Sequence, residues 1–507
     1  MLACKMTSFC FKKKQKGKSY YARTSDLERP VYAFQATNGQ ARRKMKEKKS
    51  FVLFTLFFIT ALYTPLLFPR KKVLDVISEG KLFSFRHYPK FFGDINTRYG
   101  NIAERSYLLT NMGKFRNRMY NKGVYLDATL FQFLGCNTRG GACQERLRYN
   151  GNAEYWLILD SAKIGAWSRG AFMLHAETNW TKCDSINDDV GSLLAANSRS
   201  RVPVPEEEKT TLSEVVLEQV FTDNFLLRLG KLDATGPIDG TDFANNGRFQ
   251  FLYAGLVNNP MISHFTAYTS LALLPIWKLT NRHALMASIA DAQGTADKSG
   301  FDTAFNGETT YCIQYVFSPV VNKKPGNYRI IYAHSTKPLT SYELDERHLI
   351  GQEIGTIKIP KKCSNHAVLL NFDQYIWVHD KNENIKYRHH RPPIGILLFG
   401  RAGWEPEDRN TIDQFYSIGI GGYGGPYNRY YDQWGIGYCA THISCSLRKD
   451  LQEKGICFRK FEHAAEAFYN IQLTPSLHFT INAQAIRPPL STRCTAFLFN
   501  ARLQTDF

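Results

Sequence analysis

Residues 495–507 read TAFLFNARLQTDF. Every second position from Thr495 to Phe507 is apolar or threonine, whereas the positions between them are wholly polar from Asn500 onward. A period of two indicates a β-strand with one apolar and one polar face. The stretch is about twice the usual strand length, and a strand that crosses a bilayer at a tilt needs about 9–11 residues. The stretch therefore predicts a membrane-spanning strand or, alternatively, the edge strand of a soluble sandwich.

The same alternation recurs along the chain and decides between these alternatives. An apolar face for lipid and a polar face for water, repeated in many short segments, is the pattern of a transmembrane barrel. A count near sixteen fits a barrel wide enough to hold water. We predict an all-β fold, a closed antiparallel transmembrane β-barrel of about 16 strands with a short N-terminal helical segment. The predicted strands are 124–133, 153–163, 168–178, 212–221, 225–233, 264–274, 282–292, 308–318, 326–334, 368–379, 393–403, 412–422, 433–443, 463–472, 476–486 and 495–507.

Composition agrees with a barrel and argues against membrane-spanning helices. After Phe68 no uncharged apolar run approaches the roughly 20 residues that a membrane helix requires. Aromatic residues make up 14% of the chain, and barrels use them as girdles at both membrane interfaces. The long polar stretches 179–210, 335–367 and 380–392 are predicted loops, mostly extracellular.

The basic charge of the chain lies mainly in its first fifty residues. They hold fourteen Lys and Arg against three acids, and so carry about +11 of the net +19. A nucleic-acid partner is therefore not indicated. Met45, a lysine cluster and the apolar run 51–68 resemble a secretory signal, with an inner-membrane anchor as the alternative. We predict a basic leader, or an extension upstream of the true start, in 1–44 and a signal peptide in 45–72.

The region that follows has no strand period. Residues 106–122 can form one helical segment with Leu108, Leu109, Met112 and Phe115 on one side, and Gly123 is a natural stop. We predict an N-terminal periplasmic or plug segment in 73–123, or a plain linker, and the outer-membrane β-barrel in 124–507.

Nine of the eleven cysteines lie in the part predicted to be exported, where disulfides can form. Cys136 and Cys143 are the first candidates for a pair. No cysteine pair has the short spacing of a structural zinc site, and His389 and His390 lie in a polar loop. No metal and no cofactor are predicted.

Several segments resemble a known family in their order and strand placement. The longest is FGRAGWEPEDRNTIDQFYSIGIGGYGGPYNRYYDQWGIGY at 399–438. The others are LRLGKLDATGPIDGTDFANNGRFQF at 227–251, FDTAFNGETTYCIQYVFSP at 301–319, PGNYRI at 325–330 and EAFYNIQLTP at 466–475. Together they resemble the carbohydrate-selective porin family of the OprB type, over roughly residues 105–507.

The resemblance implies a sixteen-stranded barrel in a Gram-negative outer membrane that lets sugars diffuse down a gradient, with a narrowed waist of charged side chains. It implies outer-membrane lipid as the surroundings and a monomer or homotrimer. The closing strand that ends at Phe507 would be recognised by the barrel-assembly machinery. The loop 335–367 and the cysteine count exceed what the family leads us to expect.

Sugar selectivity needs wall groups that both donate and accept hydrogen bonds, since a sugar is neutral and rich in hydroxyls. Arginine supplies a rigid fork of donors, and carboxylates supply acceptors. Binding must stay weak enough to allow exit. The alternation places the candidate pore-lining residues on the polar face, and the arginines in matching segments are the strongest of them. They are Arg228, Arg329, Arg401, Glu154, Glu214, Glu218, Asp373, Glu466, Asn470 and His478, with Asp160, His175, Glu177, Asn371, Gln484 and Arg502 on the same faces.

Three other functions compete with a sugar porin. A general diffusion porin would have the same fold. An outer-membrane barrel enzyme needs a nucleophile and a base at the lipid face; His442 lies near Ser444, but no G-x-S-x-G motif is present. An anchored periplasmic β-domain would keep the 51–68 run uncleaved and bury its apolar faces.

Overall fold

The structure is a computed structural model that describes residues 101–103, 105–109, 112, 114–180, 185–204, 207–233, 236–304, 306–342, 361–379, 392–427 and 429–507. The chain divides into two units, Met1–Leu67 and Phe68–Phe507, and the described residues all belong to the second. The predicted leader in 1–44 and the predicted signal peptide in 45–72 lie outside the described residues.

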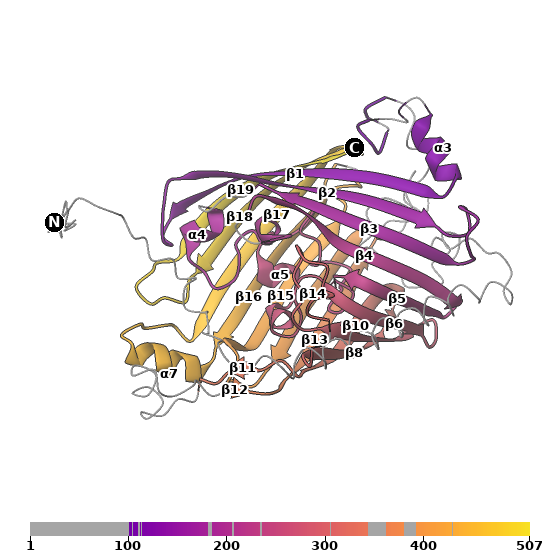
Figure 1. Ribbon diagram of the computed structural model, residues 1–507. Coiled ribbons are helices and arrows are strands. Elements are labelled where there is room, and N and C mark those ends of the chain that lie inside the picture. Colours follow the sequence, from indigo (N-terminus) through magenta and orange to yellow (C-terminus); the bar gives the residue numbers. More distant parts are fainter. Residues whose placement is uncertain are drawn as a thin grey trace, which may run out of the picture. The chain divides into compact units, whose positions relative to one another are not determined.

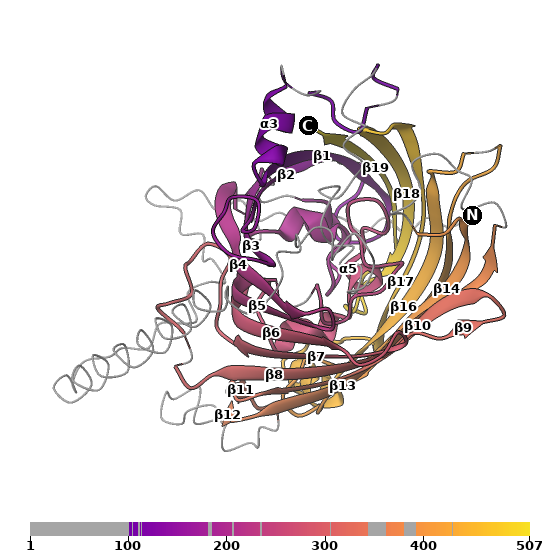
Figure 2. The same cartoon turned by 90° about the vertical axis from the view of Figure 1, so that its right-hand side faces the viewer.

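Sixteen antiparallel strands of the described chain close into a barrel, as the sequence predicted (Figure 1; Figure 2). Each strand pairs with its neighbours in chain order, and the last strand returns to the first. The strands are β1 (Val124–Arg139), β2 (Leu147–Asp160), β3 (Gly170–Asn179), β4 (Lys209–Thr222), β5 (Phe225–Leu232), β6 (Ser270–Lys278), β7 (His283–Asp291), β8 (Thr309–Phe317), β10 (Lys324–Ser335), β13 (Asn365–Val378), β14 (Gly395–Trp404), β15 (Ile412–Tyr423), β16 (Gln433–Ile443), β17 (Phe461–Thr474), β18 (Leu477–Arg487) and β19 (Ala496–Asp506).

The closing strand β19 has the two faces that its sequence predicts. Its register sets Ala501 opposite Leu134 of β1 and Ile481 of β18. Arg502 is buried on the inner face, whereas Phe499 is 62% exposed on the outer face. The apolar face therefore points to lipid and the polar face into the barrel.

The two rims differ in the length of their connections. At the rim that holds the end of β19, turns as short as 223–224 and 475–476 join strands. The opposite rim carries the connections 180–208 and 233–269. Since transmembrane barrels have short periplasmic turns and long extracellular loops, the first rim is periplasmic. Of the three polar stretches predicted to be mostly extracellular, 380–392 is the exception, because the flanking strand ends Val378 and Gly395 lie at the periplasmic rim. Residues 380–391 themselves are outside the described residues.

Each of the sixteen predicted segments overlaps one observed strand, and the largest displacement is at β6. Predicted at 264–274, it spans Ser270–Lys278. Residues Pro260–His264 form a 3-10 helix instead. Leu274 and Ile276 are apolar although they face inward, because a chain segment covers them inside the barrel. This removes the polar–apolar contrast on which the prediction depended.

Short elements complete the described chain. They are α3 (Phe115–Asn121), α4 (Ile186–Val190), η3 (Ser198–Arg201), α5 (Ala254–Val257), η4 (Pro260–His264), α7 (Cys445–Glu453), and the two-residue strands β9 (Val320–Val321), β11 (Leu339–Thr340) and β12 (Lys361–Lys362). None of the helices in the described part has the length and apolar character needed to span a membrane.

The predicted helix over 106–122 is shorter than expected. Only α3 forms, because Met112 and Lys114 have positive φ angles of 46° and 72°, which a right-handed helix does not allow. Gly123 does follow the helix end with a φ of 84°. Arg116 donates to the backbone oxygen of Phe507 at 2.7 Å, so the segment is fastened to the chain end at the periplasmic rim.

The cysteine pair that the sequence suggested does not form. All eight described cysteines carry free thiols, including Cys136 and Cys143. Cys136 lies on the outward parity of β1, whereas the backbone of Cys143 turns back to donate to Asp189 at 3.0 Å. Closeness in sequence therefore does not bring the two sulfur atoms together.

The lipid-facing assignment predicts a large effect of an outward charge. Ile481 lies near the middle of β18 and is 51% exposed. Ile481→Arg should lower the free energy of unfolding by about 2–4 kcal/mol, the cost of arginine near the bilayer midplane. Urea unfolding in lipid vesicles measures it, with Ile481→Leu as the matched control. Equal stability of the two variants would contradict the assignment.

Candidate pore constriction

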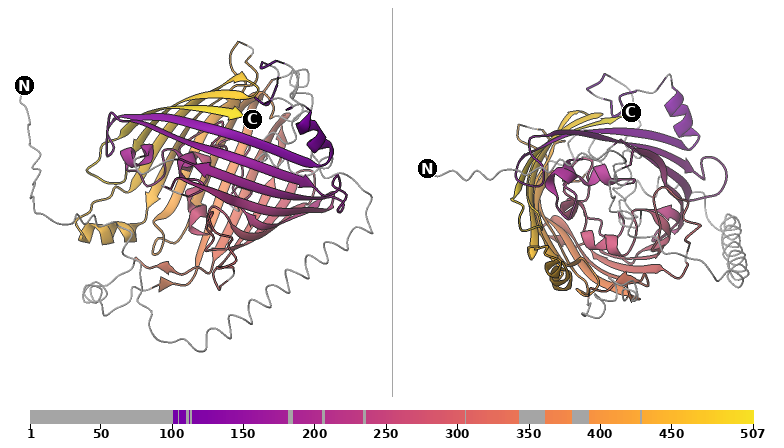
Figure 3. Two further views of the ribbon diagram at one scale, coloured as in Figure 1. Left: turned by 45° about the horizontal axis from the view of Figure 1, so that its top comes forward. Right: turned by 60° about the vertical axis from the view of Figure 1, so that its left-hand side comes forward.

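Two segments between strands lie inside the barrel (Figure 2; Figure 3). We call residues 185–204, between β3 and β4, the first lumen segment, and residues 236–269, between β5 and β6, the second. The first includes α4 and η3, and the second includes α5 and η4. Both contact strands that are remote in sequence, so the inner wall must hold them by side chains.

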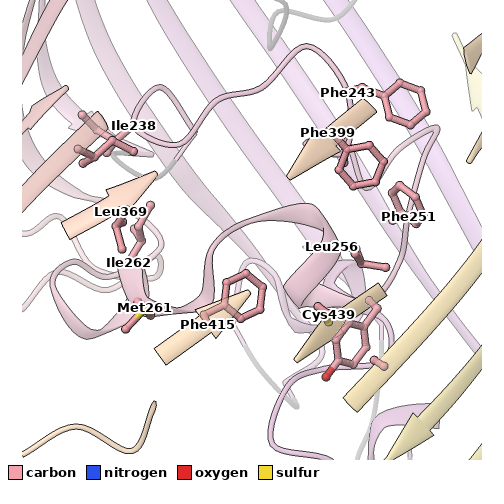
Figure 4. Packing of buried hydrophobic residues seen from close by; sticks show 14 of the residues in the cluster. Ile238, Phe243, Phe251, Leu256, Met261, Ile262, Leu369, Phe399, Phe415 and Cys439 are labelled. Carbon is pink, nitrogen blue, oxygen red and sulfur yellow. The ribbon is translucent and has the colours of Figure 1, made fainter. Parts of the chain in front are cut away.

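Apolar side chains hold one face of the second lumen segment against the wall (Figure 4). The ring of Phe243 lies 5.7 Å from that of Phe399 on β14 and 6.2 Å from that of Phe468 on β17. The glycine-rich strands make this approach possible. A Cβ at Gly421 would lie 2.1 Å from Phe243, and one at Gly437 would lie 2.9 Å from Leu256. The repeated glycines of the 399–438 motif thus form a flat inner wall for the segment.

Two carboxylates of β17 fasten both lumen segments. Glu466 accepts hydrogen bonds from the backbone N–H of Leu252 at 2.7 Å and of Tyr253 at 2.8 Å. Glu462 accepts from the backbone N–H of Leu193 at 2.6 Å, in the first lumen segment, and from the Tyr253 hydroxyl at 2.7 Å. Burial and the neighbouring Glu462 raise the pKa of Tyr253 well above its ordinary value, so this phenol stays a donor.

Arg401 of β14 is turned entirely toward the second lumen segment. Its Nε donates to Asp239 Oδ2 at 3.0 Å, and its Nη2 donates to the backbone oxygens of Ala244 at 2.7 Å and Val257 at 3.1 Å. Only 1% of its side chain is exposed. The sequence suggested that Arg401 donates to sugar hydroxyls; in the structure its Nε and Nη2 donate to the second lumen segment instead.

A second polar group beside Arg401 joins β10 and β13 to the same segment. Arg329 Nη1 donates to Asp373 Oδ1 at 2.8 Å. Asn327 Nδ2 bridges Asp373 Oδ2, at 2.8 Å, and Asp242 Oδ2, at 3.1 Å. The backbone N–H of Asp242 also donates to Asp373. Asp373, predicted as a pore residue, therefore helps to position the segment.

On the opposite wall of the barrel, a single carboxylate binds both lumen segments. Glu154 of β2 is fully buried, and its two oxygens bind Arg199 of the first lumen segment and Arg248 of the second. Burial disfavours the charge of Arg199, but Glu154 and Glu177 outweigh it and raise its pKa above the ordinary value. Both guanidinium side chains keep 14% exposure.

His175 and its neighbours lie beside Glu154 and its two arginines. Its Nδ1 lies 2.9 Å from Glu214 Oε1, and its ring stacks on Trp156 at 3.8 Å. Glu177 accepts hydrogen bonds from Ser213 at 2.7 Å and from Tyr268 at 3.0 Å. One ligand atom each of Glu154, His175 and Glu177 lies within 4.8 Å of the other two, a spacing that could hold a metal ion. The two guanidinium groups on Glu154 place positive charge there and disfavour a cation.

The remaining predicted residues also face inward. Arg228 donates to Glu218 Oε2 at 2.8 Å, Asn470 donates to Thr480 at 2.7 Å, and the His478 ring lies edge-on to Phe249 of the second lumen segment at 5.0 Å. Arg502 donates to the backbone oxygens of Gly247 and Gln250. Alternation thus placed every candidate on the correct face.

Sequence reasoning missed the residues that complete the site from the lumen segments and from β17. They are Arg199, Asp239, Asp242, Arg248, Tyr253 and Glu462. One signal was available in the connection 233–269. It is long for a solvent-exposed loop and contains Phe243 and Phe251, which such a loop would leave exposed.

A known protein family resembles this chain in sequence, and solved structures resemble it in fold. Residues 144–507 match the sequence model described as carbohydrate-selective porin, OprB family. The high-pH structure of Pseudomonas putida OprB is similar, with a TM-score of 0.68 and 18% identity over 79% of this chain and 98% of that chain. Its low-pH structure has a TM-score of 0.50 and 16% identity over 80% of this chain and 99% of that chain. No curated protein matches the sequence.

Proposed function

The chain belongs to the OprB family of carbohydrate-selective porins, and we propose that the two lumen segments, rather than the barrel wall alone, select its sugars. The protein is a channel of the Gram-negative outer membrane through which carbohydrates diffuse passively. The wall residues Arg401, Glu462 and Glu466 all bind the segments through hydrogen bonds. The observation that carries the proposal is that Arg199 and Arg248 are bound to Glu154 and still keep 14% exposure.

In this proposal Arg199, Arg248 and Glu214 touch the solute. Guanidinium groups donate in pairs to adjacent hydroxyls, and the Glu214 side chain, 16% exposed, accepts. Phe249 follows Arg248 on the same segment and offers a flat apolar face to the C–H side of a sugar ring. Each contact in water contributes about 1 kcal/mol, which allows the sugar to bind and to leave.

Liposome swelling tests the proposal. We expect wild-type protein to admit glucose and a disaccharide faster than an amino acid of equal size. Arg248→Lys keeps the charge but loses the paired donors, so sugar uptake should fall several-fold while amino-acid uptake stays unchanged. Arg282→Lys, at an exposed position of the periplasmic rim, is the matched control. Uptake that follows solute size alone in all three proteins would favour a general diffusion pore.

The proposal also covers the amino-terminal segment, the oligomeric state and the closing strand. We infer a signal peptide in 45–72, a monomer or homotrimer, and recognition of β19 and Phe507 by the barrel-assembly machinery. The apolar run 51–68 behind a lysine cluster and the alternation of residues 495–507 support these inferences. The amino-terminal sequence of the mature protein from outer membranes tests the first of them.

A further inference from the structure

Three basic side chains gather at the extracellular end of the outer barrel face, over β17 and β18. Lys460 immediately precedes β17, His463 lies near the start of that strand, and Arg487 ends β18. The strand register sets His463 directly opposite Arg487. We call Lys460, His463 and Arg487 the outer-rim basic patch.

The patch faces the membrane and not the lumen. Glu462 and Ala464, on either side of His463, are buried inside the barrel, and so is Ile486 beside Arg487. The ammonium of Lys460 lies over the ring of Phe461, 5.7 Å from its centroid, and this ring stacks on His463. The three basic groups therefore share one outward surface.

No acidic side chain balances the patch in the part of the chain that the structure describes. None of its Asp or Glu carboxylates lies within 4.0 Å of Lys460, His463 or Arg487. An anion bound here would supply the negative charge that Lys460 and Arg487 lack among these described side chains. The Tyr438 hydroxyl lies 2.7 Å from His463 Nδ1, which holds the ring and leaves Nε2 for a ligand.

Small side chains lie directly below the patch on the same face. Four alanines form two cross-strand pairs, flanked by larger apolar groups on both neighbouring strands. The pairs are Ala465–Ala485 and Ala467–Ala483, and the flanking residues are Ile436 and Tyr438 on β16 and Phe497 and Phe499 on β19. Alanine methyl groups project less far than these neighbours. An acyl chain can therefore lie along the alanines and be contacted from both sides.

We propose that the outer-rim basic patch binds a phosphate group of the phosphorylated glycolipid in the outer leaflet, with an acyl chain along the four alanines. Arginine and lysine are the groups that bind phosphate best, the first as a fork and the second as a point charge. The boundary between basic groups and apolar surface matches the boundary between lipid headgroup and acyl chain. A free phosphate ion would gain nothing from the alanines.

Native mass spectrometry of the full-length porin in detergent, titrated with lipid A, tests this proposal. The variant Lys460→Gln/His463→Gln/Arg487→Gln removes the charges and keeps hydrogen-bonding side chains. We expect its affinity for lipid A to fall about tenfold or more, as the loss of charge-assisted contacts predicts. Wild-type protein should lose a similar factor with dephosphorylated lipid A. Ala483→Phe, which blocks the acyl path, should also weaken lipid A binding.

Arg282→Gln removes one exposed positive charge at the opposite rim and should leave lipid A binding unchanged. Heat-modifiable mobility on gels verifies that each variant is folded, and sugar uptake should stay at the wild-type level. Unchanged affinity in the triple variant would overturn the proposal, and so would equal binding of phosphorylated and dephosphorylated lipid A. Full displacement of lipid A by inorganic phosphate would identify a free anion as the ligand and would also overturn it.

Discussion

Arg401→Ala should widen the pore and abolish its sugar preference while the barrel still folds. The change removes four hydrogen bonds that join β14 to the second lumen segment. It also leaves Asp239 buried without its charged partner, which costs about 3–5 kcal/mol when one member of a buried pair is removed. The segment can lower this cost by moving Asp239 into water. We expect a several-fold rise in single-channel conductance in planar bilayers, and new protease cleavage within 236–258.

The control for this prediction is Arg228→Ala. Arg228 and its partner Glu218 both lie on wall strands, β5 and β4, so their ion pair joins two neighbouring strands of the wall. Its loss should leave conductance near the wild-type value. Arg401→Ala/Asp239→Ala removes the unpaired carboxylate and should restore part of the stability. Wild-type conductance in Arg401→Ala would mean that the apolar contacts of Phe243 and its neighbours hold the segment alone.

The barrel could be predicted because its outer face contacts lipid, whereas its inner face contacts water and polar groups. Where lipid lies outside and polar groups lie inside, as at β18 and β19, the alternation is visible in the sequence and fixes both register and facing. The contrast disappears where the inner wall is apolar. Leu274 and Ile276 of β6 and Leu397 and Phe399 of β14 face inward against the second lumen segment. These strands therefore look apolar on both faces, and the boundaries of β6 were the least accurate.

The face of each site residue could be predicted, but its partner could not. Period two assigns Glu154 and Arg401 to the interior without further information. Their partners Arg199, Arg248 and Asp239 lie in segments without a period, and 45 residues separate Glu154 from Arg199. Only the three-dimensional path of the chain brings them together. Function followed more readily, because the 399–438 motif resembles that of a porin family; in the structure its glycines form the wall that receives the second lumen segment.

Glu154→Gln should have the second large effect, because one buried carboxylate holds both lumen segments. Glutamine keeps the size of the side chain but removes the charge that balances Arg199 and Arg248. Two guanidinium groups then face each other near a neutral amide, and both segments should detach from β2. We expect a several-fold higher conductance, a loss of sugar selectivity, and cleavage by trypsin after Arg199 and Arg248, which should resist trypsin in the wild type because Glu154 binds them. Glu207→Gln changes the charge of an exposed loop side chain by the same amount and serves as the control.

The two variants together measure how the second lumen segment is held. Arg401 fastens it from β14 through Asp239, and Glu154 fastens it from β2 through Arg248. Residues that share a movable element do not act independently, so their effects should not add. Once either clamp has released the segment, losing the other should raise conductance little further, and the double variant Glu154→Gln/Arg401→Ala should resemble the stronger single one. If the conductance increases of the two single variants instead multiply in the double variant, the two clamps restrain separate parts of the segment. Each part would then narrow the pore independently.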